Sequence, residues 1–134
     1  HLVPHCESNE VYRGILAGKS TGVFNGRVFV HRDAQKTNGY QSNNNILLSD
    51  DATMNSKPEL EIYADDVRCS HGSTTGQLDE DAVFYLRARG LDEFGATALL
   101  LTAFASDVLN SISNEELRNS LETKIQSKLK EMRA

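Results

Sequence analysis

The chain has 134 residues, of which 39% are hydrophobic and 25% are charged, and its formal net charge is −5. This length allows one ordinary domain, or the end of one architecture with a short second one, and the composition is typical of a globular protein with a core. The negative charge argues against nucleic acid or an anionic membrane as a partner, and no apolar run approaches the roughly 20 residues of a membrane-spanning helix.

The start of the chain and its two cysteines bear on compartment and completeness. Residues 1–5 lack the pattern of a signal peptide, and Cys6 and Cys69 are too few for a disulfide framework. We therefore expect a cytoplasmic protein with reduced thiols. Because the chain does not begin with Met and its first segment already carries strand-forming residues, we also expect a fragment of a larger fold.

The first half of the sequence predicts β-structure in short apolar runs separated by turn residues. These runs are Val11–Ala17, Val23–Val30, Ile46–Leu48, Leu60–Ala64 and Val67–Cys69. Val30, Leu48 and Tyr63 lie 18 and then 15 residues apart, with Ser42–Asn45 as one of the polar breaks. Such a period favours the stacked rungs of a solenoid with asparagines at the corners, and a β-sandwich is the alternative.

The second half predicts three helices. Asp79 caps the first, which ends at Gly90, Asp92 caps the second, and Ser113 with Glu116 forms the capping box of the third. The apolar residues of the first helix are Ala82, Val83, Phe84 and Leu86. The second helix has one expected buried face, made of Ala96, Leu99, Leu100, Ala103, Phe104, Val108 and Leu109. The third has a narrow apolar stripe that fits one flank of a small bundle or a partner's groove, made of Leu117, Leu121, Ile125 and Leu129. The acidic residues 79–81 suit a helix start better than a metal site.

The candidate site is the pair Cys69 and His71. On a strand, residues i and i+2 point to the same face about 6.6 Å apart, so a thiol and an imidazole can converge on one atom. Both are ligands of zinc, copper and iron–sulfur centres, but two ligands leave a tetrahedral metal half-coordinated. The alternative is that both residues are structural, which is also the favoured reading of Cys6. No catalytic or nucleotide-binding motif accompanies them.

Two segments carry a family resemblance. Leu60–Leu78 and Phe84–Gly90 closely resemble the C-terminal signature of the SufB/SufD family of iron–sulfur cluster assembly proteins. Shorter segments also look like this family, namely Asn25–Gly26, Asn43–Asn45 and Lys57–Leu60. SufB-type members usually have a Glu after the histidine and an apolar residue in place of the cysteine. The presence of Gly72 and Cys69 around His71 therefore identifies the chain as a SufD-type member.

The resemblance implies a mainly β plus α fold. Residues 1–78 would form the last rungs of a right-handed parallel β-helix, and residues 79–134 a C-terminal helical domain. It also implies a non-enzymatic scaffold subunit that works with a SufB-type sister subunit and a SufC-type ATPase. By position, His71 matches the histidine proposed to ligate the nascent cluster, and Cys69 matches its neighbouring thiol.

Further expectations follow from the resemblance. A cluster is bound transiently at the interface with SufB, none is held stably by this fragment, and the isolated fragment can form a homodimer through an open β-edge. The location is plastid if the source is a photosynthetic eukaryote. Docking of the SufC ATPase is expected on Phe84, Tyr85, Arg87 and Arg89, because aromatic and guanidinium groups dominate interface hot spots. The alternative to docking is that Phe84 belongs to the core and that Tyr85 and the arginines cover the helix ends. Competing hypotheses for the whole chain are a purely structural solenoid, in which His71 and Cys69 only pack, and a β-helix enzyme.

Overall fold

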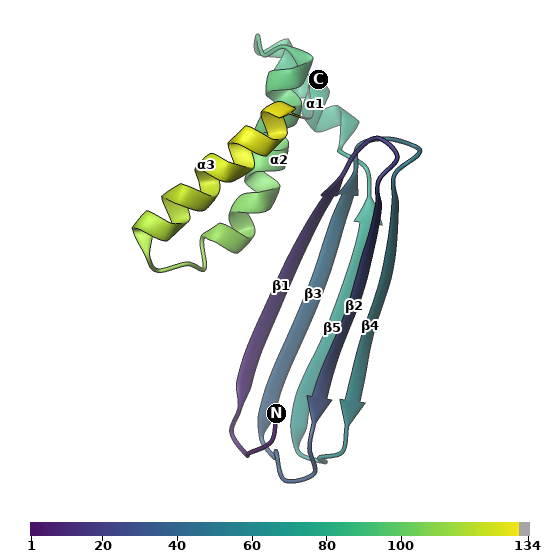
Figure 1. The fold of residues 1–134 in the computed structure, drawn as a ribbon, viewed down its shortest axis with the longest axis vertical. Helices are drawn as coiled ribbons and strands as arrows, with labels where there is room; N and C mark the ends of the chain where they lie inside the picture. The colour runs from purple at the N-terminus through teal and green to yellow at the C-terminus, as the bar shows by residue number, and fades with distance from the viewer. Residues whose placement is uncertain (132–134) are drawn as a thin grey trace. The chain divides into compact units, whose positions relative to one another are not determined.

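A computed structural model describes residues 1–131, so the last three residues of the expected helical domain lie outside the described part. The chain divides into two compact units, His1–Gly76 and Gln77–Ala134, and has an α+β fold. The strands of the first unit are β1 Glu7–Leu16, β2 Thr21–Val30, β3 Thr37–Leu47, β4 Thr53–Ile62 and β5 Val67–Gly76 (Figure 1). The helices of the second are α1 Glu80–Ala88, α2 Glu93–Leu109 and α3 Glu115–Glu131.

The strand unit contains two sheets, and the chain alternates between them. One sheet has the order β1-β3-β5 and the other pairs β2 with β4, all in parallel. Glu7 pairs with Asn38, 31 positions later, and Thr37 pairs with Val67, 30 positions later. The structural repeat is therefore two strands long, and the spacing of about 15 residues in the sequence marks half a repeat rather than a whole one.

The strands are longer and more polar than their apolar runs indicated. Residues 42–45, expected to break the chain between strands, lie inside β3, where Gln41, Asn43 and Asn45 are each 3% exposed. Alternate residues of β3 are buried, as expected for a strand with one face turned inward. The asparagines therefore lie within a strand and not at the corners of a solenoid, where they were expected. The side-chain amides of Asn43 and Asn45 do pair with each other.

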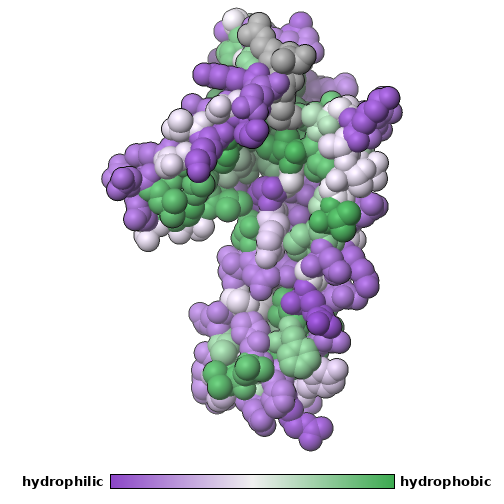
Figure 2. All heavy atoms as spheres, viewed as in Figure 1, coloured by the Kyte–Doolittle hydropathy of each residue, from purple (hydrophilic) through white to green (hydrophobic). Residues whose placement is uncertain are grey.

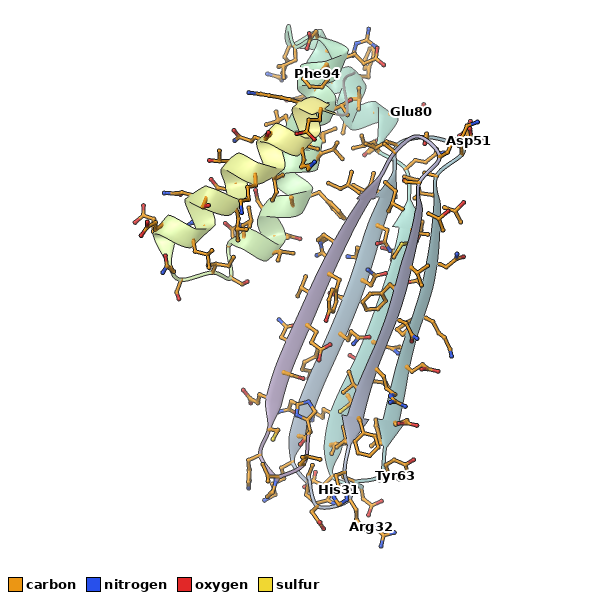
Figure 3. The ribbon with its side chains drawn as sticks, in the orientation of Figure 1. His31, Arg32, Asp51, Tyr63, Glu80 and Phe94 are labelled. Atoms are coloured by element: carbon orange, nitrogen blue, oxygen red, sulfur yellow. The ribbon has the colours of Figure 1, made fainter. Side chains whose placement is uncertain are left out.

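An apolar core fills one end of the strand unit. Val28, Val30, Ala34 and Ala64 are buried there, with Leu60, Val67 and Cys69 packed against them. In Figure 3, His31 and Tyr63 lie at this end, where β2 and β4 finish, and Asp51 lies at the opposite end. Further along the unit, the buried side chains of β3 are polar, namely Gln41, Asn43 and Asn45, and the ring of Phe24 lies beside Gln41.

The helix boundaries follow local capping chemistry. The Asp79 carboxylate accepts hydrogen bonds from the N–H groups of residues 81 and 82, and that of Asp92 accepts one from Gly95. Gly90, just after α1, has a φ of 99°, which glycine adopts without strain. At α3 the cap is Asn114, whose side-chain oxygen accepts from Leu117 N–H at 3.0 Å, so the expected capping box of Ser113 was wrong.

Helix α2 packs against both α1 and α3. Its buried residues are Ala96, Leu101 and Leu109, whereas Leu99, expected in the core, is 49% exposed. No residue of α1 is buried, so the alternative that places Phe84 in the core was wrong. None of the helices within residues 1–131 is long and apolar enough to cross a membrane.

Candidate functional site

Cys69 and His71 lie within β5 rather than at its end, because the strand continues to Gly76. Their side chains share the inner face of the sheet. Ser73, two residues further on, donates a hydrogen bond to Asn43 inside the unit, and Cys69 packs on the core, so the intervening His71 has the same orientation. Cys69 is half-buried and His71 is exposed.

The thiol of Cys69 faces the interior beside a glycine. A Cβ atom placed on Gly39, its partner on β3, would lie 3.4 Å from the sulfur, 3.4 Å from a Val28 methyl and 3.6 Å from the His1 imidazole. Gly39 therefore leaves room next to the sulfur. The other cysteine, Cys6, precedes β1, and its thiol donates to the Val3 carbonyl at 3.1 Å, so the two thiols belong to different environments.

Two polar residues lie in line with His71 across the sheet, on the same side of it, and were missed by sequence reasoning. Gln41 is its partner on β3, and Glu10 is the partner of Gln41 on β1. The Gln41 side-chain amide donates to the Glu10 carboxylate at 2.8 Å, while its oxygen is buried without a hydrogen-bond partner among residues 1–131. A repeat of 30 to 31 residues would have aligned these three positions, but the shorter period obscured it.

Cys69 and His71 together form an incomplete set of metal ligands. A thiolate and an imidazole are soft donors suited to iron–sulfur or zinc centres, and both sit on β5, an edge strand of its sheet. Within residues 1–131 no three His, Cys, Asp or Glu side chains are grouped so as to hold a metal ion. Any four-coordinate centre on this strand therefore needs donors from outside residues 1–131.

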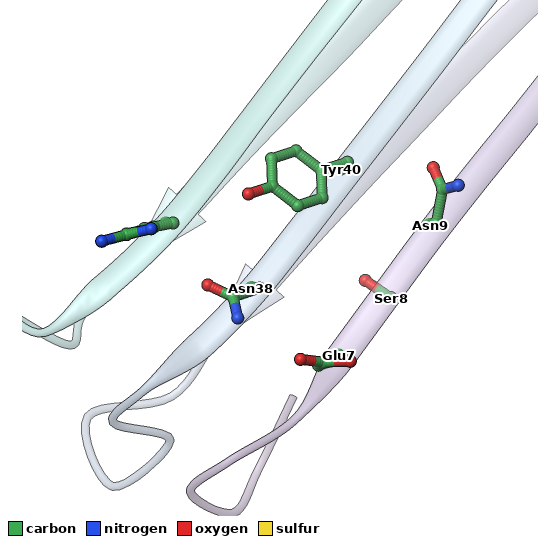
Figure 4. A pocket seen from close by; sticks show the side chains of 6 residues that line it. Glu7, Ser8, Asn9, Asn38 and Tyr40 are labelled. Carbon is green, nitrogen blue, oxygen red and sulfur yellow. The ribbon is translucent and has the colours of Figure 1, made fainter.

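A shallow polar hollow lies elsewhere on the same sheet. It is lined by Glu7, Ser8, Asn9, Asn38, Tyr40 and Arg68 (Figure 4). Asn38 and its strand partners are outward-facing, on the opposite side from the buried row of β3. The hollow is therefore separate from Cys69 and His71, and it contains none of the residues expected to bind metal.

The first helix presents an exposed aromatic and basic surface. Phe84 is 73% exposed and Tyr85 is 55% exposed, and Figure 2 shows hydrophobic surface on the helical unit. The Arg89 guanidinium lies 4.3 Å from the centre of the Tyr85 ring, and Arg87 forms an ion pair with Glu93 at 3.4 Å. Phe84 and Arg87 also line a hollow with Ala88, Leu91, Asp92 and Glu93. The four residues expected at a partner interface are thus all exposed on α1 and its C-cap, with Phe84 and Arg87 at one hollow and Tyr85 against Arg89.

Comparisons with known proteins agree on one family. The family described as "SUF system FeS cluster assembly, SufBD core domain" matches residues 1–104. The chain is 40% identical to the iron–sulfur cluster assembly protein SufD of Escherichia coli over 96% of its length, and 46% identical to an iron–sulfur cluster assembly SufBD family protein of Synechocystis over 88%. It is 43% identical to the chloroplastic protein ABCI7 of Arabidopsis thaliana over 87%. The chain spans 30%, 26% and 25% of these relatives, respectively.

Proposed function

The chain belongs to the SufBD core family of the SUF system of iron–sulfur cluster assembly, as a SufD-type member, and from this premise we propose that it is the C-terminal part of a non-enzymatic scaffold subunit. In this proposal His71, with Cys69 nearby, contributes ligands to a nascent cluster that is completed by a SufB-type sister subunit. The cluster is the cargo of the assembly, held transiently at the interface, and not a resident cofactor of this chain.

A right-handed parallel β-helix is the proposed architecture of the strand unit within the longer protein. The support is the alternation of successive strands between two parallel sheets, because a coil with two strands per turn pairs each strand with the next but one. In that arrangement β5 belongs to the last turn before the helices. Its outer edge then has backbone N–H and C=O groups free to meet another chain.

The observation that carries the ligand proposal is the position of His71. It is exposed on an edge strand, on the same face as Cys69, and it has no third ligand-type residue beside it within residues 1–131. An exposed imidazole at an unpaired edge is available to an incoming subunit, and the missing donors would come from that subunit. A purely structural histidine has no such need for access.

Anaerobic reconstitution with iron and sulfide tests this proposal. The chain mixed with its SufB-type partner should develop the visible absorption of a cluster, and His71→Ala should lose most of it while His5→Ala, another exposed histidine, should not. The chain alone should hold no stoichiometric cluster. Full absorption in a folded His71→Ala complex would contradict the ligand role and favour the structural alternative.

Docking of a SufC-type ATPase is proposed on α1. Support comes from the exposure of Phe84 and Tyr85 and from the hollow beside Phe84 and Arg87, since exposed aromatic and guanidinium groups are typical of interface hot spots. We place the protein in the cytoplasm of a bacterium or, in a photosynthetic eukaryote, in the plastid, in line with the chloroplastic name of the Arabidopsis relative. The isolated chain is expected to pair with a second copy through the β5 edge.

A further inference from the structure

The Gln41 side chain, inside the strand unit, contains a polar atom that its surroundings do not satisfy. Gln41 is 3% exposed, and its side-chain oxygen has no hydrogen-bond partner among residues 1–131. A buried amide oxygen without a donor is costly and rare in folded proteins, so this atom points to a partner that forms under other conditions. The question is which neighbouring residue can supply the donor.

Few residues aligned with Gln41 across the two sheets can donate a hydrogen bond to its side-chain oxygen. Its neighbours along its own sheet are Glu10 on one side and His71 on the other. Across the interior, a Cβ atom on Gly26 would lie 2.6 Å from the Gln41 oxygen, so the amide occupies the space that this glycine leaves. The strand partner of Gly26 is Pro58, which has no N–H group. The opposite sheet therefore provides no side-chain donor at this level.

The orientation of the Gln41 amide is set by Glu10. The amide nitrogen donates to the Glu10 carboxylate at 2.8 Å, and a carboxylate accepts but does not donate. The oxygen of Gln41 must therefore face away from Glu10. Neighbouring strands are about 4.8 Å apart, so a side chain on β3 and one on β5 that share a face and a level are within reach of each other.

We propose that Gln41 is a positioning residue for His71: its side-chain oxygen accepts a hydrogen bond from one ring N–H of His71, and Glu10 fixes the amide in the orientation that accepts. The other ring nitrogen then keeps its lone pair available as a metal donor. Histidines that bind metals commonly have their second ring nitrogen held in this way, which selects the tautomer and the ring orientation. The purpose of this hydrogen bond, to prepare His71 as a ligand, rests on the proposed function. The test of the hydrogen bond does not require a cluster.

The tautomer of His71 can be measured without any cluster. Nitrogen-15 spectra of the chain in alkaline buffer distinguish a ring held in one tautomer from a ring that averages between two. His71 should show one tautomer, while the exposed His5 serves as the internal reference for averaging. If the nitrogen shifts of His71 match those of His5 in the wild-type chain, the proposal is overturned before any variant is made.

Two variants separate positioning from packing. Gln41→Met retains the length of the side chain but removes the acceptor, so the His71 signals should move to the averaged position. The exchange of both residues, Glu10→Gln with Gln41→Glu, retains the amide–carboxylate pair and an acceptor beside His71, so it should keep the single tautomer. Averaged His71 signals in a folded exchange variant, or an unchanged tautomer in folded Gln41→Met, would contradict the proposal.

Asn45→Leu is the matched control, because it removes a second buried amide of β3 that is aligned with Thr75 and not with His71. The His71 tautomer should survive this change even if the stability of the chain falls. Loss of the tautomer in this control as well would assign the effect to general loosening of the unit and overturn the specific role of Gln41. The tautomer measurement and the cluster reconstitution test different claims. If His71→Ala does not affect the cluster, the ligand role fails but the tautomer result stands. If the tautomer is averaged, the role of Gln41 fails but the ligand role of His71 stands.

Discussion

Asn43 and Asn45 form a reciprocal pair of side-chain hydrogen bonds inside β3. The Asn45 amide donates to the Asn43 oxygen at 2.8 Å, and the Asn43 amide donates to the Asn45 oxygen at 3.2 Å. The Asn43 oxygen also accepts from the hydroxyls of Ser56, at 2.6 Å, and Ser73, at 3.3 Å. One side chain thus connects β3 with β4 in the other sheet and with β5, so the middle of the strand unit is held together by hydrogen bonds.

Replacement of this central asparagine should destabilise the strand unit. Asn43→Ala leaves several buried or half-buried donors without their acceptor, and we expect a loss of about 1–3 kcal/mol in the free energy of unfolding. Chemical denaturation measures this loss. Asn55→Ala, at an exposed position of β4, is the matched control and should change stability little. Equal effects of the two substitutions would contradict the structural role of the buried pair.

Gly26 and Gly72 should respond oppositely to alanine. A Cβ on Gly26 would lie 2.6 Å from both the Gln41 oxygen and the end of the Phe24 ring, so Gly26→Ala should displace these side chains and cost about 1–3 kcal/mol. Gly72 has no atom within 4 Å of such a Cβ, and Gly72→Ala should be neutral or stabilise by about 0.4–1 kcal/mol through the unfolded state. Thermal unfolding compares the two, and a Gly26→Ala variant as stable as the wild type would refute the packing described for Gln41.

Two single substitutions identify which residue caps the N-terminus of α3. Asn114→Ala removes the side chain that accepts from Leu117 N–H and should cost about 0.5–2 kcal/mol, as other N-cap losses do. Ser113→Ala, one residue earlier, should be close to neutral. Unfolding monitored by helical circular dichroism gives both values. A larger loss for Ser113→Ala would restore the capping box that the sequence suggested.

The docking surface proposed on α1 can be tested by pull-down of a SufC-type ATPase. Phe84→Ala and Tyr85→Ala remove exposed aromatic surface, and together they should weaken binding by more than about tenfold, the effect expected for a hot spot of 1.4 kcal/mol or more. Leu117→Ala, at a position of α3 that is 50% exposed, is the control and should bind normally. Unchanged binding by the folded double variant would move the docking site away from α1, and weak binding by Leu117→Ala would place it on α3.

Several features of this protein were determined by the sequence alone, because they depend on neighbouring residues. The caps at Asp79 and Asp92 and the glycine after α1 were predicted correctly, since each acts within one helical turn. The shared face of Cys69 and His71 follows from the two-residue period of a strand. The long signature around these residues predicted membership of the SufBD family, which the comparisons confirmed.

The interior of the strand unit was decided only by the tertiary structure. Residues 42–45 have the composition of a loop, yet they lie in a strand with a buried face because β3 has a neighbour on each side and the inward amides of Asn43 and Asn45 satisfy one another. The alignment of Gln41 with His71 spans 30 positions, and no local pattern encodes it. The burial of Leu101 in place of Leu99 likewise depends on which side of α2 meets its neighbouring helices, a choice made by packing and not by helical period.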